Sequence, residues 1–203
     1  MELFLFSAFI VFNFFIRLVF SLSKNVSHTD AYVHLFVIDQ RRQHGLDFEV
    51  RNSLVPGPFA YPPLQHMLVG LFPRQMWVPV AKSLNIINDI LLIICTYATA
   101  NFVVSHLDSP IQSVTGLSIG FLTALISSTT PILFGTNARI AGAGARTLGG
   151  LIVFVYLVSF GCGYYFYPPA FALCFILSIV VCYSSVFALQ TMLFLSIGLS
   201  IGL

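Results

Sequence analysis

Residues 3–22 have the sequence LFLFSAFIVFNFFIRLVFSL, and Arg17 is the one charged residue among them. A hydrocarbon core of about 30 Å is crossed by a helix of about 20 residues, so this run is long enough to span a membrane. It lacks the basic segment that opens a secretory signal peptide, because Glu2 is the first charge in the chain. We therefore expect a retained first transmembrane helix.

The rest of the chain repeats this pattern. Further apolar runs occupy residues 80–104, 114–134, 148–166, 170–189 and 192–203. Everything after position 169 is too long for one crossing at about 1.5 Å per residue, so we expect a turn at Gln190-Thr191. The prediction is an all-α membrane protein over residues 1–203, with a bundle of about five to six transmembrane helices. The last run ends without a polar tail, so we expect the N-terminal part of a longer protein.

Composition excludes an ordinary soluble domain. The 203 residues are 58% hydrophobic and 8% charged, with a mean hydropathy of +0.93. A soluble domain carries charge on about a quarter of its residues. The net charge of +2 does not favour nucleic acid as a partner. Four cysteines lie in apolar runs without a CxxC motif, so we interpret them as packing residues.

A polar loop, residues 23–79, separates the first two apolar runs and holds four of the five histidines. Its first part, TDAYVHLFVIDQRRQH at 29–44, is predicted to be a helix. Thr29 or Ser27 would be its N-cap and Gly45 its C-terminal stop. Apolar residues among its polar ones favour an amphipathic helix lying along the membrane surface.

One face of this helix carries three groups of different chemistry. At about 100° per residue, Asp30, His34 and Arg41 fall within about 40° of one another, whereas Asp39 falls opposite. Asp30 and His34 also have the i, i+4 spacing of metal ligands. Two ligands do not define a site, so no metal is assigned, and a divalent cation is left as an alternative.

The second part of the loop is FEVRNSLVPGPFAYPPLQHMLVGLFP at 48–73. Its prolines predict irregular structure up to Tyr61. A short helix can begin at Pro63, because proline is tolerated in a first turn. Gln65 and His66 lie on this helix, which we expect to pack the loop onto the bundle.

Two charges lie inside predicted membrane helices, Arg17 in the first and Asp89 in the second. Buried charges in a membrane are costly and are usually paired or face a wet cavity. Both residues lie near the loop side, so the sequence predicts an ion pair between them. A clamp between the two helices is at least as well favoured as a functional role.

The orientation in the membrane is left open by the sequence. Counting crossings places the polar loop and the segment GTNARIAGAGART, residues 135–147, on the same side. Most basic residues lie on or near that side, which by the positive-inside rule would be cytoplasmic. Basic residues also gather where a protein binds phosphate, which would permit the opposite orientation.

The segments TDAYVHLFVIDQRRQHG and YPPLQHMLVGLFP, placed directly after a first helix, resemble the N-terminal part of the GT-C superfamily. Its members are polytopic membrane glycosyltransferases that use polyprenyl-phosphate sugars. The resemblance implies that Asp30 is the catalytic acid, with His34 beside it. The residues that it implies for substrate binding are Arg41, Arg42, Tyr61, His66, Arg139 and Arg146. The second acid of the family's common pair is missing, since Asp30 is flanked by Thr29 and Ala31.

The function implied is transfer of a sugar from polyprenyl phosphate to an acceptor hydroxyl on the extracytoplasmic side. The implied location is a multi-pass protein of a prokaryotic plasma membrane, active in building the cell envelope. A membrane transporter and a non-catalytic membrane assembly subunit are the alternatives. The apolar runs show no inverted repeat, which does not favour a transporter.

Overall fold

A computed structural model describes residues 2–22, 29–45, 50–52, 55–59, 63–106, 113–114, 117–129 and 146–202. This part of the chain is helical apart from two short hairpins, so the all-α prediction is confirmed at that level. The helices are α1 (Glu2–Leu22), α2 (Thr29–His44), α3 (Leu64–Gly70), the 3₁₀ turn η1 (Arg74–Met76), α4 (Trp77–His106), α5 (Ile119–Thr129), α8 (Arg146–Tyr165), α9 (Ala170–Ser184) and α10 (Val186–Gly202). The strands are β1 (Val50–Asn52), β2 (Val55–Phe59), β3 (Ser113–Val114) and β4 (Leu117–Ser118).

Three helices of the described residues are long and apolar enough to cross a membrane. They correspond to Glu2–Val19, Arg74–His106 and Thr147–Tyr165. The apolar helices α5, α9 and α10 are shorter. Length and composition therefore support three crossings directly, and the predicted total of five to six stays a prediction.

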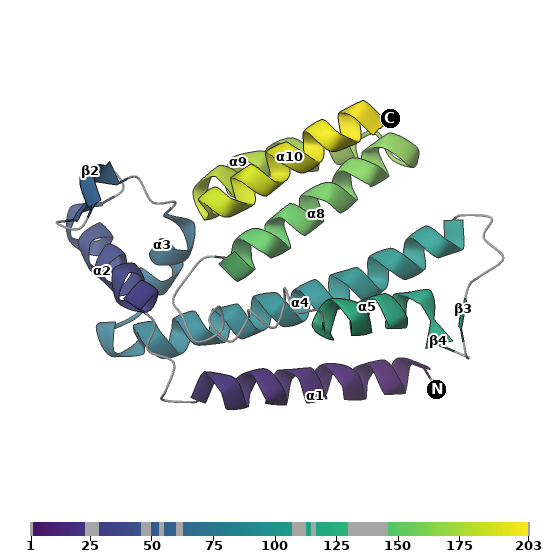
Figure 1. Cartoon of the computed structure of the whole chain (residues 1–203), viewed down its shortest axis with the longest axis horizontal. Helices are drawn as coiled ribbons and strands as arrows, with labels where there is room; N and C mark the ends of the chain where they lie inside the picture. Colours follow the sequence, from purple (N-terminus) through teal and green to yellow (C-terminus); the bar gives the residue numbers. More distant parts are fainter. Residues whose placement is uncertain are drawn as a thin grey trace.

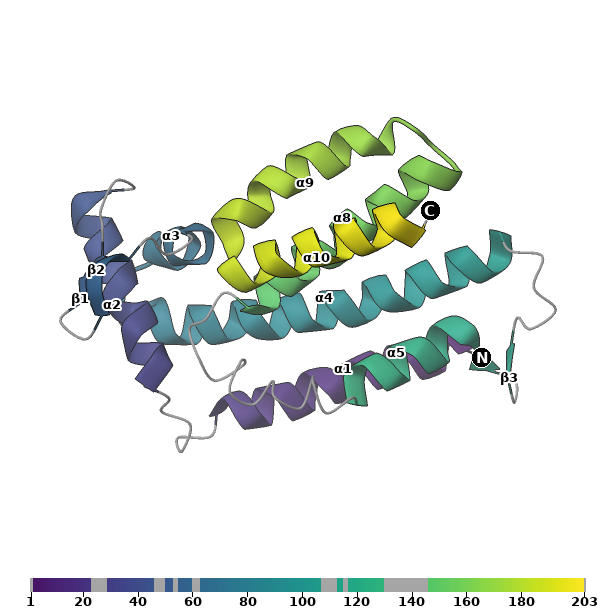
Figure 2. The ribbon, with the colours of Figure 1, turned by 45° about the horizontal axis from the view of Figure 1, so that its top comes forward.

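The helices form two groups with α4 between them (Figure 1). Helices α1 and α5 lie along one side of α4, and α8, α9 and α10 lie on the other. Helices α2 and α3 lie across the end where α4 begins, and Figure 2 shows the same arrangement from a second direction. We call this the loop end, and the opposite end of α4 the far end.

Helix α1 runs antiparallel to α4 and is fixed near both of its ends. At the far end the ring of Phe6 stacks on that of Tyr97 with centroids 3.9 Å apart. The Tyr97 hydroxyl donates to Glu2 Oε1 at 3.1 Å. At the loop end Lys82 Nζ donates to the carbonyl of Ser21 at 2.7 Å. The bundle thus brings the polar loop's two flanking helices together.

Helices α8 and α10 pack at close range through a glycine. A Cβ placed on Gly149 would lie 2.8 Å from the Cβ of Ala188. Small residues at such crossings let helix backbones approach each other, as is common in membrane bundles. Gly149 lies in the first turn of α8, so the contact holds the start of α8 against α10.

The predicted turn at Gln190-Thr191 is wrong. Both residues lie inside α10, and the chain breaks at Ser185, whose backbone is extended with φ −166° and ψ 135°. The hydroxyl of Ser184 donates to the carbonyl of Val181 at 2.9 Å. Serine side chains compete with the helix for backbone partners, which favours an interruption at this pair of serines over one at Gln190.

The predicted helix over residues 114–134 begins later than expected. Strands β3 and β4 form a two-stranded hairpin first, and α5 starts at Ile119. The hydroxyl of Ser118 accepts the Phe121 N–H at 3.1 Å, a side-chain cap that fixes this start. The residues after Thr129 lie outside the described part, so the predicted end at 134 stays a prediction.

The prolines of the polar loop do not prevent regular structure, which corrects the expectation for residues up to Tyr61. Strand β1 pairs with β2 antiparallel, Val50 with Phe59 and Asn52 with Val55. Proline is tolerated in a strand when its nitrogen faces away from the partner strand. The register between these two pairs is irregular, and Pro56 and Pro58 lie between the paired positions Val55 and Phe59.

Candidate functional site

Helix α2 ends as the sequence predicted. Gly45 has φ of 78°, a left-handed conformation that glycine adopts without a Cβ penalty. Its N–H donates to the carbonyl of Arg41 at 2.9 Å. The predicted cap at Thr29 or Ser27 depends on side chains outside the described residues. The C-terminal stop fixes the residue at which α2 ends.

The buried face of α2 packs on α3 and on the first turns of α4. Val37 and Ile38 are buried, and Ile38 belongs to a cluster with Val69, Trp77 and Ala81. The Trp77 indole N–H donates to the carbonyl of Phe72 at 2.9 Å, which satisfies its polar atom at the same time. This apolar contact positions α2 across the loop end of the bundle.

A pair of histidines joins α2 to α3. His34 Nδ1 lies 2.9 Å from His66 Nε2, and the two rings stack with centroids 5.2 Å apart. The side chains are deeply buried, since His34 is 2% exposed and His66 1%. A hydrogen bond between two ring nitrogens needs one N–H donor and one bare acceptor. One of these two ring nitrogens therefore carries a proton and the other does not.

Helix α3 buries its polar residues together with Val69, and it exposes part of its apolar surface. Gln65 and His66 are buried, whereas Met67 and Leu68 are exposed. A helix on a water-soluble protein instead points its polar residues outward and its apolar face to the core. An outward apolar face suits a surrounding of lipid.

Gln65 reaches a polar node that connects three helices. Gln65 Nε2 donates to Asn85 Oδ1 at 3.2 Å, and the Thr147 hydroxyl donates to the same oxygen at 2.8 Å. Asn85 is 0% exposed, so its amide oxygen depends on these partners. We call Gln65, Asn85 and Thr147 the Asn85 node. It brings α3, α4 and the first turn of α8 together at the loop end.

The predicted ion pair between Arg17 and Asp89 is confirmed. Arg17 Nε lies 2.5 Å from Asp89 Oδ2, and both side chains are buried. Arg17 Nη1 also donates to Asn13 Oδ1 at 2.7 Å. Asp89 follows Asn85 by one helical turn, so the ion pair lies directly beside the Asn85 node.

Of the residues predicted from the sequence, the structure brings His34 and His66 together. Arg41 is half-buried, and desolvation lowers the pKa of its guanidinium, which stays charged at neutral pH. Arg42 is exposed, and its Nη1 donates to the carbonyl of Phe72 at 3.4 Å. Asp30 lies in the first turn of α2 and Arg146 begins α8, but their side chains lie outside the described residues. Tyr61 and Arg139 lie wholly outside them.

The sequence prediction missed the Asn85 node. Asn88 and Asp89 lie three and four residues after Asn85 within an apolar run, which places each of them on the same face of α4 as Asn85. All three side chains are buried. That spacing was a usable signal, since a polar stripe along a membrane helix indicates contact with other polar groups.

No metal ligand set is found in the described part of the chain, where no three or more His, Cys, Asp or Glu side chains converge. His34 and His66 supply two nitrogens, and the predicted companion of His34 is Asp30, whose side chain lies outside the described residues. The alternative of a divalent cation at Asp30 and His34 stays untested.

The described residues line a smaller and a larger cavity. A smaller one, of about 350 Å³, lies against α2 and the start of α4 and is lined by Leu35, Phe36, Asp39, Arg74, Trp77 and Val78. A larger one, of about 620 Å³, lies between α4 and α8 at the far end. The larger cavity is therefore separate from the histidine pair and the Asn85 node.

The chain matches no family model, no curated protein and no solved structure. Inferences about function therefore depend on the residues at the loop end and their geometry.

The histidine pair gives a testable prediction about the loop. His34→Ala or His66→Ala each leaves a buried ring nitrogen without its partner, a loss of about 1–3 kcal/mol. We expect each variant to expose α2 and α3 to limited proteolysis, and the double variant to lose less than the sum. His44→Ala is the control, because His44 is exposed at the end of α2. Equal protease sensitivity of His34→Ala and His44→Ala would contradict a structural role for the pair.

Proposed function

We propose that this chain is a multi-pass membrane glycosyltransferase of the GT-C type, or the N-terminal part of one. It transfers a sugar from a polyprenyl-phosphate donor to an acceptor hydroxyl. The observation that carries the proposal is the concentration of buried polar groups at the loop end. There α2 and α3 meet the starts of α4 and α8.

The proposed reaction needs two kinds of group. As the acceptor oxygen bonds to the anomeric carbon, its proton passes to a base, and the bond from that carbon to the lipid phosphate breaks. The charge left on the phosphate is stabilised by nearby cations. We assign Asp30 as the base, because it lies in the first turn of α2 directly after α1. Arg41, Arg139 and Arg146 are assigned to the phosphate, and Arg42 and Tyr61 to the remainder of the donor.

The geometry supports a positioning role for His34. Its Nδ1 contacts His66 Nε2 at 2.9 Å, so this nitrogen joins α2 to α3. His34 follows Asp30 by one turn of the same helix, so fixing His34 also fixes the start of α2. We therefore assign His34 the role of orienting Asp30, and we reassign His66 from substrate binding to the same support.

The direct test is a transfer assay with the full-length protein in proteoliposomes. The probe is a polyprenyl phosphate that carries a radiolabelled sugar, offered with a mixture of acceptor lipids and glycans from the native membrane. Transfer of the label to an acceptor supports the proposal. Movement of the intact lipid-linked sugar across the membrane without transfer would favour a transporter. If neither transfer nor movement of the lipid-linked sugar is seen, and transfer appears only when a second subunit is added, an assembly role would be favoured.

The proposal also predicts that the loop end faces the extracytoplasmic side. Gln43 is exposed on α2 and Ser105 is exposed at the other end of α4. We expect Gln43→Cys to react with a membrane-impermeant thiol reagent in intact cells, and Ser105→Cys only after permeabilisation. The unmodified chain, with its four native cysteines, measures the background. Labelling of Ser105→Cys alone would place the loop end in the cytoplasm, as the positive-inside rule does.

A further inference from the structure

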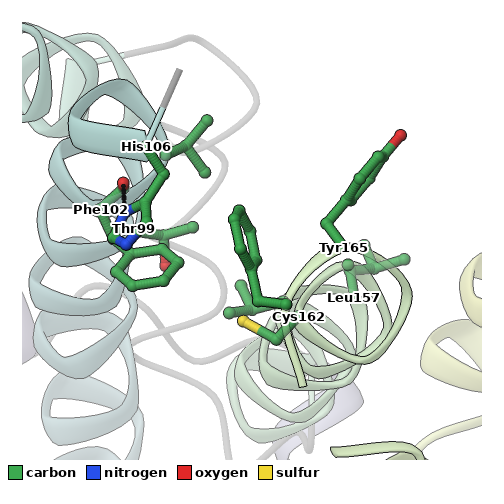
Figure 3. A pocket seen from close by; sticks show the side chains of 10 residues that line it. Thr99, Phe102, His106, Leu157, Cys162 and Tyr165 are labelled. Carbon is green, nitrogen blue, oxygen red and sulfur yellow. Dashed lines mark hydrogen bonds between the residues drawn. The ribbon is translucent and has the colours of Figure 1, made fainter. Parts of the chain in front are cut away.

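The larger cavity lies between two helices that could each cross a membrane. Figure 3 shows its two walls, with Thr99, Phe102 and His106 from α4 facing Leu157 and Cys162 from α8. The remaining lining residues are Val103, Val158, Gly161, Tyr165 and Phe166. Its volume of about 620 Å³ is within the range of about 300–1,000 Å³ typical of small-molecule sites.

The walls are apolar along the lengths of α4 and α8 that are able to span a membrane. In a bilayer, the side of the cavity faces hydrocarbon, and water does not fill an apolar cavity. The molecules that surround this side of the cavity in a bilayer are lipid acyl chains. The apolar walls therefore match a hydrocarbon chain.

One end of the cavity has a different character. The His106 ring lies 4.2 Å from that of Phe102 and 5.2 Å from that of Phe166, centroid to centroid. Tyr165 is exposed, and in Figure 3 its hydroxyl points away from the cavity. Tyrosine is enriched at headgroup depth at the ends of membrane helices, and His106 is the last residue of α4. This end is the far end of the bundle, so it belongs to the leaflet away from the polar loop.

We propose that this cavity binds one acyl chain of a membrane phospholipid whose headgroup lies beside His106 and Tyr165 in the leaflet away from the loop end. The site is distinct from the proposed donor site, which lies at the opposite end of α4. The inference depends on the membrane placement of α4 and α8 and not on glycosyl transfer. A failed transfer assay would therefore leave it standing.

Gly161 is a place from which a side chain can be added to the cavity wall. A Cβ at Gly161 meets no other atom within 4 Å, and the residue lines the cavity. A Cβ at Gly150, on the same helix, also meets nothing within 4 Å, but Gly150 does not line the cavity. The phenyl ring of Gly161→Phe should occupy the space proposed for the acyl chain. Gly150→Phe is the matched control.

The experiment uses the full-length protein in vesicles of phosphatidylethanolamine. A fraction of the phosphatidylethanolamine molecules carries a photoactivatable diazirine in one acyl chain. After irradiation, labelled peptides are quantified by mass spectrometry. We expect labelling of residues 99–106 and 157–166 well above that of α1 in the unmodified chain and in Gly150→Phe. We expect Gly161→Phe to lower it about tenfold, equivalent to about 1.4 kcal/mol of binding free energy.

Undiminished labelling in Gly161→Phe would overturn the proposal. So would even labelling over α1, α4 and α8, which indicates lipid that merely surrounds the protein. If Gly161→Phe does not fold, Thr99→Phe fills the cavity from the α4 wall and decides the same question.

Discussion

Asp30→Asn is expected to lower sugar transfer by the full-length protein by about 10²–10⁴-fold, the usual contribution of a positioned general base. Asparagine keeps the size of aspartate and much of its local hydrogen bonding, but it cannot take the acceptor's proton. The variant should therefore fold normally. The measurement is the initial rate of label transfer from the polyprenyl-phosphate sugar, at matched protein amounts.

Asp39→Asn is the matched control, because Asp39 lies on the opposite face of the same helix. Its carboxylate accepts the Gln43 side-chain N–H at 3.1 Å, an exposed contact that an amide oxygen can also make. We expect transfer within about twofold of the unmodified chain, since surface substitutions of this kind usually change stability by less than about 0.5 kcal/mol.

A contrary result would have a clear meaning. If Asp30→Asn transferred sugar at a near-normal rate, Asp30 would be only a charge at a helix start, worth about 0.3–1 kcal/mol. The site assignment would then be wrong, and the glycosyltransferase proposal would weaken with it.

Breaking the Arg17–Asp89 pair on one side is expected to cost about 3–5 kcal/mol, enough to unfold many proteins. The reason is the charge that remains, because the other partner stays buried without a counter-ion. Arg17→Ala should leave Asp89 without its ion-pair partner, and Asp89→Ala should leave Arg17 without its partner. The measurement is the folded yield and the thermal unfolding temperature in detergent.

The double variant Arg17→Ala with Asp89→Ala should recover part of this loss, because no buried charge is left. Asn13 would then lose the donor that its Oδ1 accepts at 2.7 Å, so recovery should be incomplete. Arg42→Ala serves as a control, because it removes an exposed arginine that makes a long contact of 3.4 Å. Strictly additive losses in the double variant would show that the two charges are independent.

These two experiments separate structure from chemistry at the loop end. Arg17 and Asp89 fix α1 to α4, so their loss should lower the amount of folded protein without changing the rate per folded molecule. Asp30 should do the reverse. The two patterns together test whether the loop end is a reaction site built on a rigid polar support.

The sequence by itself determined the helices and where several of them end. A long apolar run such as residues 3–22 crosses hydrocarbon whatever lies beside it, because its backbone bonds are satisfied within the helix. Gly45 stops α2 because only glycine adopts φ of 78° at no cost, which is a local property. The Arg17–Asp89 pair was also predictable, because two charges buried in apolar helices have few partners to choose from.

Only the tertiary structure decided which polar groups meet. His34 and His66 are 32 residues apart and Asn85 and Thr147 are 62 apart, so no helical period relates them. Gln190-Thr191 was a plausible break by polarity, yet the helix passes through it and breaks at Ser185, where α8 and α10 are in close contact. Each outcome depends on packing between distant segments. A neutral polar group such as Asn85 can form a hydrogen bond with many other groups, and the fold determines which of them lies close enough.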